Sequence, residues 1–172
     1  MNRTGWRRVW AFGVDCVLIT AWAGLLAAIS FGLGAGGGGS PSEPSAKVVY
    51  YIVALVTLTI PVILVSALLE HRSGATPGKR LLRLHVADLA GPSLAFSRSL
   101  LRNVVKYAPW ELGHIGIWIV PGAPFHSPPT GWSLALWASS MGIMVAQAAL
   151  IVTTGKGIHD RVAGTRVLAD RA

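Results

Sequence analysis

Residues 48–69 read VVYYIVALVTLTIPVILVSALL, and no side chain among these 22 residues is charged. As an α-helix with a rise of 1.5 Å per residue, this run is about 33 Å long, which is enough to cross a hydrocarbon layer of about 30 Å. Pro61 removes one backbone donor inside the run, so we expect a kink there. Residues 48–69 therefore predict a transmembrane helix.

The composition of the whole chain agrees with a membrane protein. Of its 172 residues 52% are hydrophobic and only 13% are charged, whereas soluble domains carry charge on about a quarter of their residues. Two further apolar runs, at about 10–33 and 132–154, are long enough to span a bilayer. We expect one membrane domain over residues 1–172. The Gly-rich segment at 34–45 is expected to be a loop.

The basic residues indicate how the chain is oriented. Of the 15 Lys and Arg residues, all but Lys47 lie in segments 3–8, 72–106 and 156–171, and positive residues stay in the cytoplasm. Segment 104–120 must then cross or re-enter the membrane. The prediction is an all-α membrane protein with four transmembrane helices (about 10–33, 48–69, 104–120 and 132–154), both termini cytoplasmic, and an outer Pro-rich loop at 121–129. The cytoplasmic location of the basic residues accounts for their excess over acidic residues, so nucleic acid is not expected as a partner.

The cytoplasmic segments contain two further patterns. Leu82, Leu84 and Val86 alternate with polar residues, which indicates a short strand at 81–88, and residues 165–168 are its expected partner. Segment 97–107 places apolar and basic residues on different faces, as an amphipathic helix at the membrane interface does. Four cations are expected to bind phosphates of anionic lipid headgroups on the cytoplasmic face: Lys79, Arg80, Arg98 and Lys106.

Several motifs together resemble the RDD family of bacterial membrane proteins. They are Arg8 and Asp15 with a spacing of seven, GKRLL at 78–82, LRN at 101–103 and HDRVAGTRV at 159–167. The resemblance places the name-giving arginine and aspartates at Arg8, Asp15 and Asp160, and Arg83 stands where the family commonly has glycine. It implies a multi-pass protein of the bacterial cytoplasmic membrane. Cation/proton antiport has been proposed for some members, which makes it a candidate activity.

Asp15 is the most informative acidic residue, because a carboxylate inside a spanning helix costs about 2.5–3.5 kcal/mol near the bilayer centre. Alternatively the hydrocarbon begins at Cys16, and Asp15 lies at the wet boundary. Arg8 is two helical turns away, about 10.5 Å, which is too far for direct contact. We expect Asp15 to pair with Arg102 or Arg161, and Arg8 to pair with Asp160 or with lipid phosphate.

Glu111 and His114 share a helix face and form a second candidate site. Their spacing is half of a carboxylate-bridged di-iron motif, but no second copy exists, so neither a metal nor another cofactor is expected. The pair either forms a proton relay or lies near the headgroups because Pro109 delays the start of the helix. Nucleophile motifs and convergent acid/base residues are absent from the sequence, so we do not expect an enzyme.

Two functions remain open. The first is a small secondary transporter that exchanges monovalent cations for protons, with Asp15 and Glu111 titrating. Because four helices enclose little polar volume, it would need a homo-oligomer, for which Gly24 and Ala28 offer a packing face. The second is a non-catalytic accessory or assembly subunit of a larger membrane complex.

Overall fold

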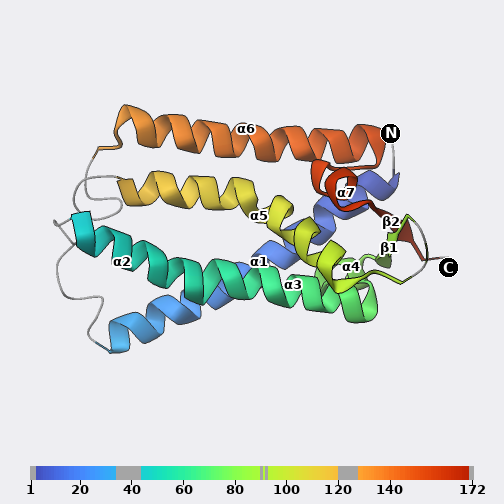
Figure 1. Ribbon diagram of the computed structural model, residues 1–172, viewed down its shortest axis with the longest axis horizontal. Coiled ribbons are helices and arrows are strands. Elements are labelled where there is room, and N and C mark those ends of the chain that lie inside the picture. Colours follow the sequence, from blue (N-terminus) through green and yellow to red (C-terminus); the bar gives the residue numbers. More distant parts are fainter. Residues whose placement is uncertain (1–2, 34–43, 90, 92, 120–127, 171–172) are drawn as a thin grey trace.

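The computed structural model describes residues 3–33, 44–89, 91, 93–119 and 128–170. The protein is a bundle of long helices with a small two-stranded sheet at one end (Figure 1). Its helices are α1 (Arg3–Gly32), α2 (Pro44–Ala54), the π-helical turn η1 (Leu55–Thr59), α3 (Ile60–Ser73), α4 (Pro77–Leu81), α5 (Phe96–Ile119), α6 (Gly131–Thr154) and α7 (Ile158–Ala163). The strands are β1 (Leu84–Asp88) and β2 (Thr165–Ala169).

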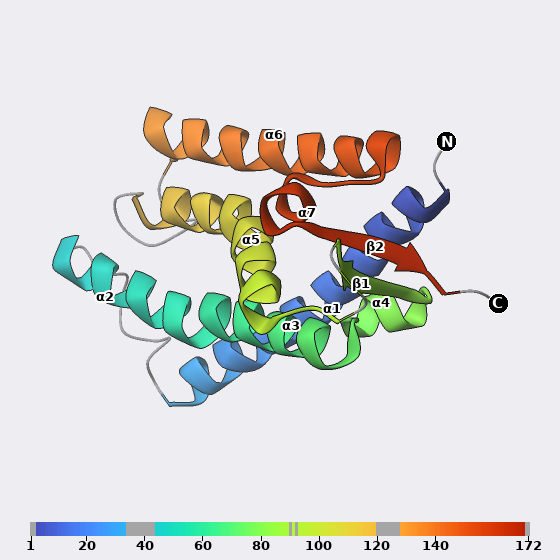
Figure 2. The ribbon, with the colours of Figure 1, turned by 45° about the vertical axis from the view of Figure 1, so that its right-hand side comes forward.

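Four rods run along the bundle: α1, the continuous α2–η1–α3, α5 and α6. The short elements α4, α7, β1 and β2 gather at one end, together with the first turns of α1 (Figures 1 and 2). We call this the sheet end of the bundle. Each rod reverses the direction of the one before it, so the chain returns to the sheet end after α6.

Within the described residues, three helices are long and apolar enough to cross a membrane: Arg3–Gly32, Lys47–Ser73 and Gly131–Thr154. An 18-residue stretch of each has a mean hydropathy of 2.0, 2.7 and 1.7, respectively. They contain the three strongly apolar spans predicted from the sequence. Large apolar side chains on them point outward, including Trp10, Val49 and Val145, which are 68%, 58% and 62% exposed. Such a surface suits lipid and would be unfavourable in water.

The structure corrects the prediction for segments 97–107 and 104–120. They form one continuous helix, α5, and not two separate helices. Pro109 lies inside α5, and Figure 1 shows that this helix bends part-way along its length, as expected in a helix that contains a proline. The carbonyl of Pro109 accepts a 2.6 Å hydrogen bond from Ser140 on α6. Because α5 carries Arg98, Arg102, Lys106 and Glu111, it is not among the three apolar candidates.

Pro61 is accommodated by the π-helical turn η1 directly before it. Proline has no N–H, so it leaves the carbonyl of the residue four positions earlier, Thr57, without its helical donor. The indole N–H of Trp22 on α1 donates to that carbonyl at 3.1 Å. A donor from a neighbouring helix thus satisfies a backbone group that lipid could not.

The predicted strand pair is confirmed. β1 and β2 are antiparallel, with Leu84 opposite Ala169 and Asp88 opposite Thr165. Arg83, which precedes β1, has a φ of 50°, a left-handed conformation that favours glycine. This conformation explains a glycine preference at that position.

Small residues allow close approach of the helices to α6. Gly113 of α5 lies against Ser140, and a Cβ on it would be 3.1 Å from that hydroxyl. Gly5 of α1 faces the backbone of α6, where a Cβ would lie 2.6 Å from the Ile151 carbonyl oxygen and 2.8 Å from Val152 Cα. By contrast, nothing lies within 4 Å of a Cβ built on Gly24. Most of the predicted loops at 34–45 and 121–129 falls outside the described residues, although Pro44 and Ser45 belong to α2.

Gly5→Ala should destabilise the protein because the new methyl group would collide with the α6 backbone. We expect a loss of about 1–3 kcal/mol, measured as a lower unfolding temperature in detergent. Gly13→Ala on the same helix meets nothing within 4 Å, so it should stabilise α1 by up to about 1 kcal/mol. Equal effects of the two variants would contradict the close α1–α6 contact.

Candidate functional site

A buried charge network joins five helices at the sheet end of the bundle. We define it by Arg8 (α1), Glu70 (α3), Lys79 (α4), Arg102 and Asn103 (α5), and Asp160 (α7), all of them buried. Its charged side chains pair across elements, Arg8 with Asp160 and Glu70 with Lys79 and Arg102, so the network links the five helices. The network is therefore the first candidate site.

Glu70 is one of its two acidic centres and is fully buried. Its Oε1 accepts hydrogen bonds from Lys79 Nζ at 2.7 Å and Arg102 Nη1 at 2.8 Å. Its Oε2 accepts from Arg102 Nη1 at 3.0 Å and Asn103 Nδ2 at 2.9 Å. A carboxylate with so many charged and polar donors can remain ionised without water.

Asp160 is the second acidic centre and is also fully buried. Its Oδ2 accepts from Arg8 Nη2 at 2.5 Å and from the Gly157 backbone N–H at 2.8 Å, and its Oδ1 accepts from Arg102 Nη2 at 3.0 Å. Burial alone would raise the pKa of Asp160, but the charges of Arg102 and Arg8 outweigh burial and hold that pKa below its usual value. Arg8 thus pairs with Asp160, which was one of its two expected partners.

Lys79 is buried within the network and does not lie on the exposed surface. Its ammonium donates to Glu70 and, at 3.3 Å, to Thr76. Burial lowers the pKa of Lys79 to about 8, although the charge of Glu70 opposes this shift. The side chain is therefore mostly protonated at neutral pH, and its charge depends on the presence of Glu70.

Asp15 has a different partner from the cations expected for it. Its carboxylate accepts from Thr76 Oγ1 at 2.7 Å and from the Gly78 backbone N–H at 2.8 Å. These groups begin α4, so Asp15 on α1 caps the N-terminus of α4 and compensates its dipole. A Cβ on Gly78 would lie 2.0 Å from the Ala11 carbonyl oxygen, so this contact requires glycine. Asp15 forms no salt bridge with Arg102 or with Arg161, which is exposed.

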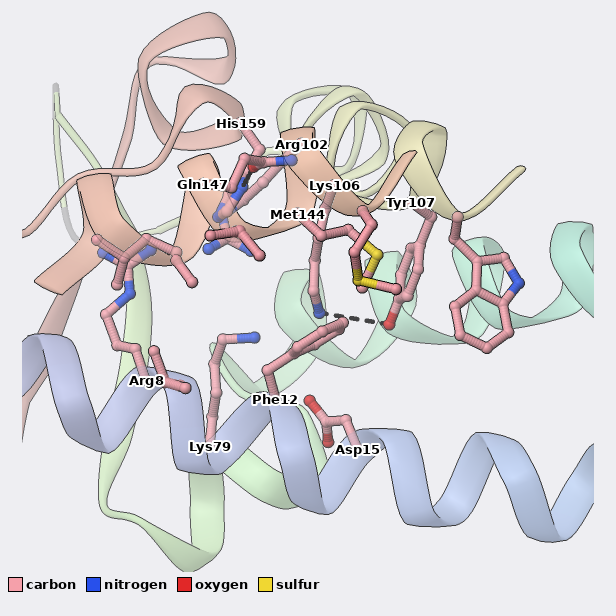
Figure 3. Close-up of a pocket in the computed structure, with 16 residues that line it drawn as sticks. Arg8, Phe12, Asp15, Lys79, Arg102, Lys106, Tyr107, Met144, Gln147 and His159 are labelled. Carbon is pink, nitrogen blue, oxygen red and sulfur yellow. Dashed lines mark hydrogen bonds between the residues drawn. The ribbon is translucent and has the colours of Figure 1, made fainter. Parts of the chain in front are cut away.

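The other cations predicted to bind lipid lie in three different environments. Arg80 is exposed and donates to Ser73, while Arg98 pairs with Asp88 at 2.5 Å. Lys106 is half-buried, and its ammonium lies 4.9 Å from the centre of the Phe12 ring and 3.3 Å from the Tyr107 hydroxyl (Figure 3). Among these cations, Lys106 alone faces the interior without a carboxylate partner in the described part of the chain.

The structure brings Glu111 and His114 together as a second candidate site. Glu111 Oε2 accepts from Thr59 Oγ1 at 2.7 Å and lies 3.4 Å from His114 Nδ1. The helix does not start late at Pro109, because α5 is continuous through it. Thr59 is the last residue of the π-helical turn, and such turns are frequent at functional sites.

Sequence reasoning missed Glu70, Asn103 and the pair formed by His159 and Gln147. Glu70 directly follows the longest apolar run, and this position at the end of a span was the available signal. His159 Nδ1 lies 2.8 Å from Gln147 Oε1. Burial and the nearby charge of Arg102 lower the pKa of His159 to about 2, so its imidazole is neutral and donates to the amide oxygen.

The model of the RDD family matches residues 3–164, nearly the whole chain. The chain belongs to the RDD family. Arg8, Asp15 and Asp160, the residues that the family's name suggests, all make the buried contacts described above: Arg8 with Asp160, and Asp15 with the start of α4. Neither a curated protein nor a solved structure matches the sequence significantly.

Glu70→Gln should destabilise this RDD protein strongly. The substitution keeps the shape of the side chain but removes the carboxylate that pairs with both Lys79 and Arg102. Asp160 is then the only carboxylate left in the network for its three buried cations. Breaking a buried ion pair on one side costs about 3–5 kcal/mol, measurable by thermal unfolding in detergent.

A matched double variant separates charge from packing. Glu70→Gln with Lys79→Met removes one charge of each sign, so it should recover part of the lost stability. Asp170→Asn, at a surface pair with His85, should change stability by less than about 0.5 kcal/mol. A wild-type melting temperature for Glu70→Gln would contradict the importance of the network.

Proposed function

We propose that this RDD-family protein is a small secondary transporter of the bacterial cytoplasmic membrane that exchanges monovalent cations for protons. The observation that carries the proposal is the Glu111 carboxylate, which lies inside the bundle with Thr59 at 2.7 Å and His114 at 3.4 Å. We refer to these three side chains as the Glu111 site.

The depth of this site supports a role in transport. Thr59 lies 12 residues from Lys47 and 14 from Ser73, so it is close to the middle of the most apolar candidate span. Glu111 touches it and lies on α5 about 14 Å beyond Arg102 along the helix axis. Ionisable residues at this depth are costly and are usually functional.

The chemistry of the Glu111 site suits competition between a cation and a proton. An ionised Glu111 and the Thr59 hydroxyl supply hard oxygen ligands, which alkali cations prefer. When Glu111 is protonated, the site loses its negative charge and its affinity for a cation. His114, three residues further on the same helix, is placed to deliver or remove that proton.

Two cavities suggest a route from the charge network to this site. A cavity of about 50 Å³ borders Thr59, and a larger one of about 290 Å³ borders the network. Both are lined by Phe12, Tyr107 and Trp110. A proton or cation moving between them would pass these three aromatic side chains, whose rotation would serve as the gate.

The proposed topology has four crossings, with α5 as the third and the sheet end in the cytoplasm. Because successive rods reverse direction, the first rod, α1, begins at the sheet end and the last rod, α6, ends there (Figure 1). Most of the basic residues lie at or near that end, which agrees with the preference of positive charge for the cytoplasm. A homo-oligomer would supply the additional polar volume that a four-helix bundle lacks.

Cysteine labelling tests the topology. In a Cys16→Ser background, Pro128→Cys before α6 should react with an impermeant maleimide on intact cells. Ser93→Cys, between β1 and α5, should react only after the cells are opened, because α5 separates the two positions by one crossing. Both residues are exposed in the structure. Labelling of both positions from the same side would contradict a spanning α5.

Proteoliposomes test the transport activity. A pulse of sodium or potassium should release protons from vesicles that contain the wild-type protein, read by a pH-sensitive dye. Glu111→Gln cannot titrate and should reduce this flux to that of empty vesicles, whereas the surface variant Asp170→Asn should retain it. Absence of flux for the wild type, with stable co-purification of another membrane protein, would instead support an accessory subunit.

A further inference from the structure

A cavity of about 290 Å³ lies between α1, α5 and α6, next to the charge network (Figure 3). One side is polar and includes Lys79, Arg102 and Lys106. The other side is formed by apolar side chains from α1, α5 and α6, among them Phe12, Trp110 and Met144. An amphiphile with a polar head and an apolar chain fits such a division, whereas a small inorganic ion would leave the apolar part unfilled.

The charges at the polar side do not balance. The network and the cavity together hold four cations and three carboxylates: Arg8, Lys79, Arg102 and Lys106 against Asp15, Glu70 and Asp160. His159 at the cavity wall is neutral, because burial and the charge of Arg102 lower its pKa to about 2. One positive charge is therefore in excess, which one monoanionic group would neutralise.

Lys106 holds that excess charge. It forms no salt bridge with any described carboxylate. Its ammonium donates to the Tyr107 hydroxyl and lies against the Phe12 and Tyr107 rings. Figure 3 shows its side chain extending into the cavity toward Phe12. Lys79 also points into this space and uses only two of its three N–H donors, on Glu70 and Thr76. Two ammonium groups can therefore donate to a guest.

The mouth of the cavity opens toward lipid. Met141 and Val145 of α6 line it and are 61% and 62% exposed. Met141 lies 10 residues from Gly131 and 13 from Thr154, in the central part of a candidate span. A ligand would therefore enter sideways from the hydrocarbon layer and not from water.

We propose that this cavity is a binding site for an anionic phospholipid with a monoanionic phosphodiester, such as phosphatidylglycerol. The phosphate accepts hydrogen bonds from Lys106 Nζ and Lys79 Nζ, and part of one acyl chain lies against Phe12 and Met144 and leaves between Met141 and Val145. A volume near the lower end of about 300–1,000 Å³ for ligand sites admits a headgroup and part of one chain. This site shares the larger cavity and Phe12 with the proposed route to the Glu111 site, but its test measures lipid binding and does not depend on transport.

Native mass spectrometry of the full-length protein in detergent tests the proposal. Titration with phosphatidylglycerol should show one lipid retained at much higher affinity than phosphatidylcholine. Lys106→Gln should weaken this retention by about tenfold or more, since it removes the charge-assisted contact. Lys156→Gln, which removes an exposed lysine outside the cavity, should leave retention unchanged.

A second variant makes the test independent of charge. Ala148 lines the cavity, so Ala148→Phe should fill part of it and weaken phosphatidylglycerol binding while every cation remains. Equal retention of phosphatidylcholine, or wild-type retention in both variants, would overturn the proposal. Oleate or inorganic phosphate binding as tightly as phosphatidylglycerol would also overturn it, because the source of the anion would then not be a phospholipid.

Discussion

The guanidinium of Arg102 joins Glu70 and Asp160, two carboxylates that lie 90 residues apart in the sequence. Its planar fork can donate to two acids at once, which the single ammonium of a lysine cannot do in the same fixed geometry. Through these acids Arg102 also orders Lys79 and Arg8, so α1, α3, α4, α5 and α7 all depend on one side chain. In a lipid-facing bundle, where burial of apolar surface between helices gives little driving force, such polar contacts fix the arrangement.

Hydropathy and charge placement predicted the parts of the fold that depend on local sequence. The run at 48–69 specifies a span by itself, and the alternation around Leu84 specifies a strand. The division of 97–120 into two helices was wrong, because the local pattern separates basic from apolar residues, whereas the structure uses Arg102 and Lys106 as interior side chains of one helix, α5. A pattern cannot distinguish a cation that faces lipid headgroups from one that faces a buried carboxylate.

The candidate site was predictable only where a residue stood out from its surroundings. Asp15 is a carboxylate inside an apolar helix and Arg8 belongs to the motifs that resemble the RDD family, so both stand out in the sequence. Glu70 lies one residue beyond an apolar run, where its position alone does not distinguish it. The partners of Asp15 could not be predicted, because they are the backbone N–H of Gly78 and the hydroxyl of Thr76. Both groups are uncharged, so the pattern of charges in the sequence does not reveal them. Nothing in the sequence distinguishes Lys79 from a surface lysine, and only the tertiary structure shows that it is buried.

The sequence positions of the network have a consequence for biosynthesis. Arg8, Glu70, Lys79 and Arg102 are translated well before Asp160, which the ribosome reaches only after the last long helix has been made. Until then Arg8 has no acid to meet, and Arg102 can use only one side of its fork. Interactions between residues so distant in sequence form late. The bundle therefore acquires its final packing after translation of α7, and a chain that ended before that point would lack the acid that Arg8 and one side of Arg102 pair with.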